Sequence, residues 1–130
     1  MIPRYRAWDK EFKEMVQVDA LVFDEQIIKA TYKNRNIVKE DLKNYVLMQS
    51  TGLKDKNGKE IFEGDVLKVT NLSSWLEVVS FNEKKAMFVS KEAKREVEET
   101  PLYDLFNTDI FEVEIIGNIH TNPELAEVSS

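Results

Sequence analysis

Four acidic residues lie close together in the middle of the chain, next to two glycines that indicate turns. Carboxylates at such spacing can act as a general acid and base, or bind a hard cation such as Mg²⁺ or Ca²⁺. Asp and Asn side chains are also common in turns, because they accept hydrogen bonds from nearby backbone N–H groups. We favour the turn interpretation, so the sequence predicts neither a catalytic residue nor a metal site here. The four residues are Asp55, Glu60, Glu63 and Asp65.

Other residues that could carry out chemistry are few. The chain has one histidine, His120, and no cysteine, which excludes a cysteine nucleophile and a typical zinc site built from its own residues. Ser50 and Thr51 could be nucleophiles with His120 as their base, but no Gly-x-Ser-x-Gly sequence surrounds them. The glycines are spaced as turn residues and form no phosphate-binding loop. We therefore predict that the protein is not an enzyme and uses no cofactor.

Lysines and arginines in the first half could form a nucleic-acid-binding face. Residues 1–62 contain 12 Lys and Arg against 10 Asp and Glu, whereas residues 63–130 contain 6 against 14. The whole chain has a net charge of −6, and non-specific nucleic-acid binding depends on a basic surface. We keep this function as an alternative. Its candidates are the basic residues Lys29, Lys33, Arg35, Lys39 and Lys43 and the aromatic residues Tyr5, Trp8, Tyr32, Trp75 and Phe81.

Length and composition indicate one folded domain over residues 1–130. The chain is 42% hydrophobic and 32% charged, which is typical of a soluble protein large enough to bury a core. Its N-terminus lacks the apolar segment of a signal peptide, and no uncharged apolar run reaches the ~18 residues of a membrane-spanning helix. We therefore expect a cytoplasmic protein whose last residues, 126–130, are frayed.

The segment over residues 49–69 organises the predicted fold. It contains three of the four glycines, with a short apolar stretch between successive turns. Asn57-Gly58 favours a type I′ hairpin. Two turns so close together force the chain to double back, and we expect apolar residues of this segment to meet in one core. These residues are Leu53, Ile61 and Val66.

Alternating apolar residues and turn signals predict about seven or eight short strands. Residues 16–23 and 27–32 favour a hairpin, although residues 9–23 could instead form a helix. Residues 91–99 are charged and could be a solvated helix or a hairpin extension, and a short helix is expected after Pro101. The spacing predicts a mainly β fold, a small, partly open antiparallel barrel or meander with an SH3-like core and one or two short helices.

The central segment, residues 49–65, resembles the signature of the YopX family of phage and prophage proteins. Residues 6–9, and residues 115–120 with 122–125, resemble the same family near the two ends of the chain. The resemblance implies a small, largely β protein of phage or prophage origin, with no reaction, cofactor or catalytic residue to carry over. The residues that carry the signature are Arg6, Trp8, Gln49, Thr51, Gly52, Asp55, Gly58, Glu63, Gly64, Asp65, Gly117, Asn118 and Pro123.

From these observations we expect a non-enzymatic accessory protein in a bacterial host cell. It would bind a phage or host protein, or a second copy of itself, through an exposed sheet edge or its acidic half. Two alternatives from other classes are a nucleic-acid-binding β-barrel and a metal-assisted hydrolase built on Asp55, Glu63 and Asp65.

Overall fold

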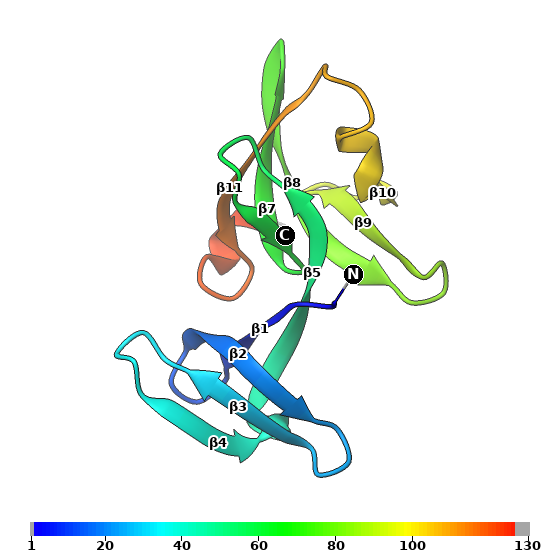
Figure 1. Cartoon of the computed structure of the whole chain (residues 1–130). Coiled ribbons are helices and arrows are strands. Elements are labelled where there is room, and N and C mark those ends of the chain that lie inside the picture. Colours follow the sequence, from blue (N-terminus) through cyan, green and yellow to red (C-terminus); the bar gives the residue numbers. More distant parts are fainter. Residues whose placement is uncertain (1, 127–130) are drawn as a thin grey trace. The chain divides into compact units, whose positions relative to one another are not determined.

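The computed structural model describes residues 2–126 and is mainly β (Figure 1). Strands account for 54% of the residues and helices for 8%. Neither of the two antiparallel sheets closes into a barrel within the described residues. This confirms the predicted fold class, an open antiparallel arrangement with a few short helices. In the same residues no helix is long and apolar enough to cross a membrane.

The chain forms two compact units, Met1–Ser50 and Thr51–Ser130, called here the first and second unit. The prediction of a single domain stays a prediction, because compactness does not show whether either unit folds alone. One ten-residue strand, β5, begins in the first unit and ends in the second.

The first unit is a series of antiparallel strands with short connections (Figure 1). The strand order of its sheet is β4-β3-β2-β1-β5-β6, in which β6 pairs with β5 in the second unit. Residues 14–22 form a strand, so the predicted hairpin is confirmed over the alternative helix. The elements are β1 Tyr5–Asp9, β2 Glu14–Val22, β3 Ile27–Thr31, β4 Ile37–Asp41, the 3₁₀ helix η1 Leu42–Asn44 and β5 Tyr45–Lys54.

The second unit contains a five-stranded antiparallel sheet of order β10-β9-β8-β7-β11. Its last strand, β11, pairs with β7 and thereby joins residues about fifty positions apart in the sequence. The short helix expected after Pro101 is confirmed as η2, and a further short helix, η3, follows β11. The elements are β6 Glu60–Phe62, β7 Asp65–Asn71, β8 Ser73–Asn82, β9 Met87–Glu92, β10 Thr100–Pro101, η2 Leu102–Leu105, β11 Glu112–Asn118 and η3 Pro123–Leu125.

Each unit buries its own apolar cluster. In the second unit Ile61 is fully buried and Leu53 packs against the same cluster, as predicted. Val66 is fully buried too, but it points to the opposite face of β7 from Leu67 and Val69, because side chains alternate along a strand. The buried cluster of the first unit contains Ala7, Val16, Ile28, Ala30 and Tyr45.

Two local predictions need correction. The turn at residues 55–59 is not a type I′ hairpin, which needs a positive φ at both central residues: Gly58 has a φ of +81°, but Asn57 does not have a positive φ. For residues 91–99 the helix alternative is wrong: the hairpin of β8 and β9 extends to Glu92, and irregular chain follows. Of the tail predicted to be frayed, residues 127–130 lie outside the described part of the chain.

Candidate functional site

Asp55, the first of the four acidic residues, is occupied by backbone hydrogen bonds. Its Oδ1 accepts the N–H groups of Asn57 and Lys59, both at 2.9 Å, and its Oδ2 accepts that of Ile115 at 3.0 Å. Burial raises the pKa of Asp55, but these three hydrogen bonds and the Lys59 charge outweigh burial, so its pKa lies below the ordinary value. An anionic, fully bonded carboxylate is a poor proton donor or acceptor.

Asp65 likewise serves the turn beside it. It is 1% exposed, and its Oδ2 accepts the N–H of Phe62 at 2.8 Å. Gly64 has a φ of +86°, which residues with a side chain rarely adopt, and its N–H donates to the Val79 carbonyl at 2.8 Å. Within residues 2–126, no group of three or more Asp, Glu, His or Cys side chains could hold a metal ion. The structure therefore gives no support to the hydrolase hypothesis.

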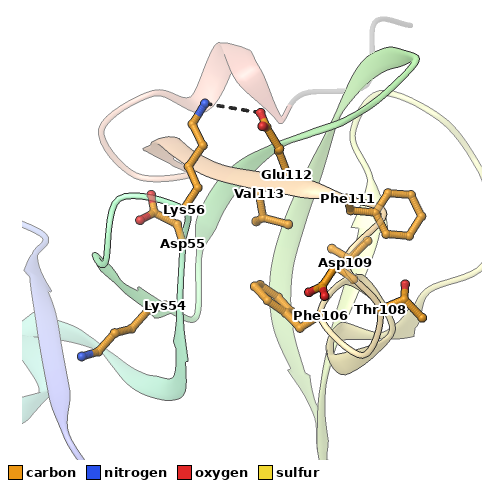
Figure 2. A pocket seen from close by; sticks show the side chains of 10 residues that line it. Lys54, Asp55, Lys56, Phe106, Thr108, Asp109, Phe111, Glu112 and Val113 are labelled. Atoms are coloured by element: carbon orange, nitrogen blue, oxygen red, sulfur yellow. Dashed lines mark ion pairs between the residues drawn. The ribbon is translucent and has the colours of Figure 1, made fainter.

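A shallow pocket of about 210 Å³ lies beside Asp55 (Figure 2). On one side, the ammonium of Lys56 forms ion pairs with Glu112 at 3.7 Å and Glu114 at 3.3 Å. The other polar groups in the lining are Lys54, Thr108 and Asp109, and the lining includes neither histidine nor cysteine. The pocket thus offers no nucleophile paired with a base.

Thr51, the proposed nucleophile of the second unit, is used by the backbone. Its hydroxyl donates to the Ile61 carbonyl at 2.8 Å and accepts the N–H of Leu53 at 3.1 Å. Ser50, in the first unit, is 4% exposed. His120 contributes its backbone N–H to the Asn118 side chain at 3.0 Å. The Thr51 hydroxyl therefore serves the backbone of β5 and β6.

The signature residues near the end of the chain shape a turn between β11 and η3. The Asn118 side chain accepts the N–H groups of His120 and Thr121, at 3.0 and 2.9 Å. A Cβ atom on Gly117 would lie 2.9 Å from the Asn122 side-chain Cγ, so a larger residue there would displace the Asn122 side chain. Pro123 is the first residue of η3, where a missing N–H costs nothing.

The remaining signature residues are spread over both units. Trp8 is 9% exposed in β1, Arg6 pairs with Gln17 and Met48 in the strand register, and Gln49 pairs with Tyr5. Gly52 has a φ of +80° within β5, and Glu63 directly precedes the Gly64 corner. No single site unites the thirteen residues.

The sequence reasoning missed a chain of hydroxyls and carboxylates in the first unit. The Tyr32 hydroxyl lies 2.5 Å from Asp9 Oδ2 and 2.6 Å from the Tyr45 hydroxyl, which lies 3.0 Å from Glu40 Oε2. Burial and the hydrogen bonds to Asp9 and Tyr45 raise the pKa of Tyr32 far above its ordinary value. Both phenols therefore stay protonated and hold the sheet together rather than act as nucleophiles.

The aromatic candidates for nucleic-acid stacking are likewise used in packing. Trp75 donates its indole N–H to Glu77 at 2.8 Å and packs edge-on against Phe111 at 5.9 Å between ring centres. Phe81 packs edge-on against Phe88 at 5.1 Å, and Tyr32 belongs to the chain just described. A stacking platform needs several exposed aromatic faces next to one another, and the residues above do not provide one.

The outer face of β2, β3 and β4 has a different character. A β-bulge lies between Val18 and Ala20, where the pairing with β3 shifts by one residue. Since such a shift turns the following side chains to the other face, Ala20 and Val22 point outward instead of into the core. They line an apolar groove of about 380 Å³, together with Ile27, Lys29, Ile37, Val38 and Lys39.

Two lysines of the predicted basic set flank this groove. Lys29 and Lys39 are direct partners in the β3–β4 register. Lys33 and Arg35 belong to the turn between these strands, and Lys43 pairs with Asp41 at 3.8 Å. The groove, its two lysines and the strand β4 at the end of the sheet form the candidate site.

Comparison with known proteins gives a family match and similar solved structures. The family model described as YopX protein matches residues 4–127. Protein EF1440 from Enterococcus faecalis has 28% identity and a TM-score of 0.62, and the match covers 98% of this chain and 99% of that one. Protein yopX from Bacillus subtilis has 22% identity and a TM-score of 0.55 over 97% of each chain, which shows the fold alone. No curated protein matches.

Proposed function

The chain belongs to the YopX family, and on that premise we propose that it is a non-enzymatic accessory protein that binds another protein by adding a strand to β4. No catalytic activity is known for this family, and the names of the similar proteins state no partner. A phage or prophage origin and a place in the cytoplasm of the bacterial host are part of the same proposal. The observation that carries it is the unpaired edge of β4.

Backbone hydrogen bonds at both ends of β4 define which groups face outward. The N–H of Tyr32 donates to Asn36 at 2.9 Å, and the N–H of Leu42 donates to Gln26 at 2.8 Å. Because bonded and non-bonded residues alternate along an antiparallel pair, Val38 and Glu40 bond to β3. The backbone groups of the three residues between them therefore face away from the sheet: Ile37, Lys39 and Asp41.

This edge is available to another strand. Within residues 2–126 no strand pairs with the outer side of β4, and four of its five residues are exposed. An edge with unpaired N–H and C=O groups is a template for strand addition, in which main-chain hydrogen bonds supply affinity and neighbouring grooves supply specificity. The apolar groove beside β4 fits that second role.

A different protein fits this edge better than a second copy of the chain. The symmetric register that pairs β4 with its copy over all five residues centres on Lys39, so each Lys39 would oppose the other. Lys29 lies beside Lys39 in each copy, which would place four ammonium groups in one row. Like charges directly opposite each other destabilise a strand pair, and we therefore propose a heterologous partner.

Nucleic-acid binding remains the alternative from another class. It would use the exposed lysines of residues 29–43, but three of the five aromatic candidates, Trp75, Phe81 and Tyr32, are already in contact with other aromatic side chains. A shift assay with single- and double-stranded oligonucleotides at two salt concentrations tests it, because phosphate contacts weaken steeply with salt.

Photo-crosslinking followed by amide exchange tests the proposal. A photoreactive residue replaces Lys39 in the full chain, and the control carries it at Leu72, which is fully exposed in the second unit. We expect a bacterial protein to crosslink from position 39 only. With that partner purified, the amides of residues 37, 39 and 41 should exchange more slowly, while those of 38 and 40, already bonded to β3, should change little.

Three results would overturn the proposal. Equal crosslinking from both positions would show non-specific contact. A partner that protects other amides and leaves these three unchanged would bind elsewhere. A second copy of the chain as the only crosslinked species, with a mass that rises with concentration, would show self-association.

A further inference from the structure

The strand register arranges the outer face of β2–β4 in rows. Ala20, Lys29 and Lys39 form one row across the three strands. On the side of the loop after β2, Val22 and Ile27 are neighbours, and Thr31 and Ile37 are neighbours on the other side. This face is the outer one because Ile28 and Ala30, the alternate residues of β3, are fully buried. Two lysines thus interrupt an otherwise apolar groove.

Within the described residues, the two ammonium groups form no ion pair. Neither Lys29 nor Lys39 has a side-chain hydrogen bond within the same residues. Two carboxylates share this face but have other partners. Asp19 accepts the hydroxyl of Thr31 and the amide of Gln17, at 2.5 and 2.8 Å, and Asp41 pairs with Lys43 at 3.8 Å.

Apolar side chains next to the lysines are exposed as well. Ile37 is 63% exposed and Val22 40% exposed, and both line the groove. A pair of like charges opposite each other destabilises the pairing of β3 with β4. The side chains of Ile37 and Val22 are exposed to water, so they contribute little of the free energy that burial of apolar surface supplies. A segment with both an anionic and an apolar side chain would reduce the charge repulsion and bury the apolar side chains if it covered this face.

We propose that β4 and the adjacent groove bind an extended acidic segment of the partner protein, antiparallel to β4. In that segment a carboxylate side chain lies opposite Lys39, and an apolar side chain two residues later lies opposite Ile37. Period-two alternation places both on the outer face. The inference rests on the proposed strand addition and adds the chemistry that selects the partner.

Charge complementarity favours this occupant over others. A carboxylate opposite Lys39 also lies near Lys29, so that one anion compensates two cations. A strand with a lysine or arginine at that position would add a third cation, and a second copy of β4 would do so through its own Lys39. The selection therefore combines attraction for an acidic residue with repulsion of a basic one.

A set of three blocked peptides tests the inference on the full chain by NMR titration. The peptides have nine residues, with threonine at the positions that face the other side of the sheet and valine two residues after a variable position. That position carries glutamate, glutamine or lysine. We expect the glutamate peptide to shift the amide signals of β4 and to bind at least ten times more tightly than the lysine peptide.

Variants of the protein with a reversed charge test the same interaction from the side of β3 and β4. Lys39→Glu should reverse the order of the two charged peptides, and Lys29→Glu should weaken the glutamate peptide at least threefold. The matched control, Lys85→Glu, makes the same charge change in an exposed turn of the second unit and should leave the order unchanged. Sedimentation and far-UV circular dichroism confirm that each variant is folded.

The outcomes separate this inference from the function on which it rests. If the amides of residues 37, 39 and 41 become protected but the charge swaps have no effect, strand addition stands and the acidic selection is wrong. If the swaps reverse the order without protecting these amides, the groove binds the peptide without strand addition, and the proposed function is wrong. Shifts with oligonucleotides only, or with nothing, would overturn both.

Discussion

Charged residues play opposite parts in the two units. In the second unit Asp55, 7% exposed, accepts hydrogen bonds from three backbone N–H groups, one of which lies sixty residues further along the chain. In the first unit Lys29 and Lys39 are exposed, lie opposite each other and form no ion pair within the described residues. The comparison teaches that clustering in the sequence does not identify a functional site. What separates the two sets is whether the structure already uses the charge.

This difference between the two sets of charged residues can be tested with substitutions. Changes at the bonded carboxylates should alter the free energy of unfolding, whereas changes at the two lysines should alter binding and leave stability almost unchanged.

The largest loss of stability is expected for Asp55→Ala. It leaves three backbone N–H groups without their acceptor, two of them in the turn at residues 55–59 and one in β11. We expect a loss of about 3 kcal/mol in the free energy of unfolding, since a buried unsatisfied donor costs ~1–3 kcal/mol. Urea denaturation measures it. The control Asp109→Ala, at an exposed pocket residue, should cost less than about 0.5 kcal/mol; similar losses for both would contradict the comparison.

A loss of about 2 kcal/mol is expected for Gly117→Ala. Its new Cβ would lie 2.9 Å from Asn122 Cγ and 3.1 Å from Leu125 Cδ1, and overpacking of this kind typically costs ~1–3 kcal/mol. Thermal and urea unfolding measure the loss. Asn122→Ala in the same chain should recover part of it, and a strictly additive double variant would show that this contact is not the cause.

A smaller and gradual loss in the free energy of unfolding is expected as the pH is lowered. The folded-state pKa values of Asp9 and Asp55 both lie below the ordinary 3.8. Their ionised forms therefore stabilise the fold fully above about pH 5, and this contribution is lost as the pH falls through the ordinary value and then through the folded-state pKa. Urea midpoints between pH 3 and 7 measure the slope. Asp55→Asn should reduce it, and an unchanged slope would exclude Asp55 as a source.

The smallest effect on stability is expected for Lys39→Ala. An exposed lysine that forms no ion pair within the described part of the chain contributes little, so the free energy of unfolding should stay within about 0.5 kcal/mol. Binding of the glutamate peptide described above should fall at least threefold in the same variant. A clear loss of stability without a change in binding would reverse the assignment of the two lysines.

Much of the fold could be predicted from local sequence. Strand-forming residues separated by turn residues gave β2, β3, β8 and β11, and Pro101 and Pro123 mark the starts of the last two short helices. Asp55 and Asp65 accept backbone hydrogen bonds in their turns, as turn chemistry predicts. These features depend on residues a few positions apart.

The candidate site could not be found in this way, because it depends on pairing between strands. A period-two pattern continued from Val16 and Val18 places Ala20 and Val22 in the core, and only the bulge between Val18 and Ala20 turns them outward. The opposition of Lys29 and Lys39 depends on the β3–β4 register. The hydroxyl chain from Asp9 to Glu40 joins side chains 23, 13 and 5 residues apart, which no local signal reveals.

The pairing of β11 with β7 has a consequence for synthesis of the chain on the ribosome. Strands β1–β4 of the first unit all lie within residues 5–41, so this unit can assemble as soon as the beginning of β5 has emerged. In the second unit Asp55 cannot accept the Ile115 N–H until residue 115 has been synthesised. The Gly64 carbonyl likewise cannot accept the Ile119 N–H, at 2.9 Å in the folded chain, until residue 119 has been added. In the nascent second unit β7 can pair with β8 on one edge, but its other edge stays unpaired until β11 has been synthesised, and this interval is when a chaperone would be needed most.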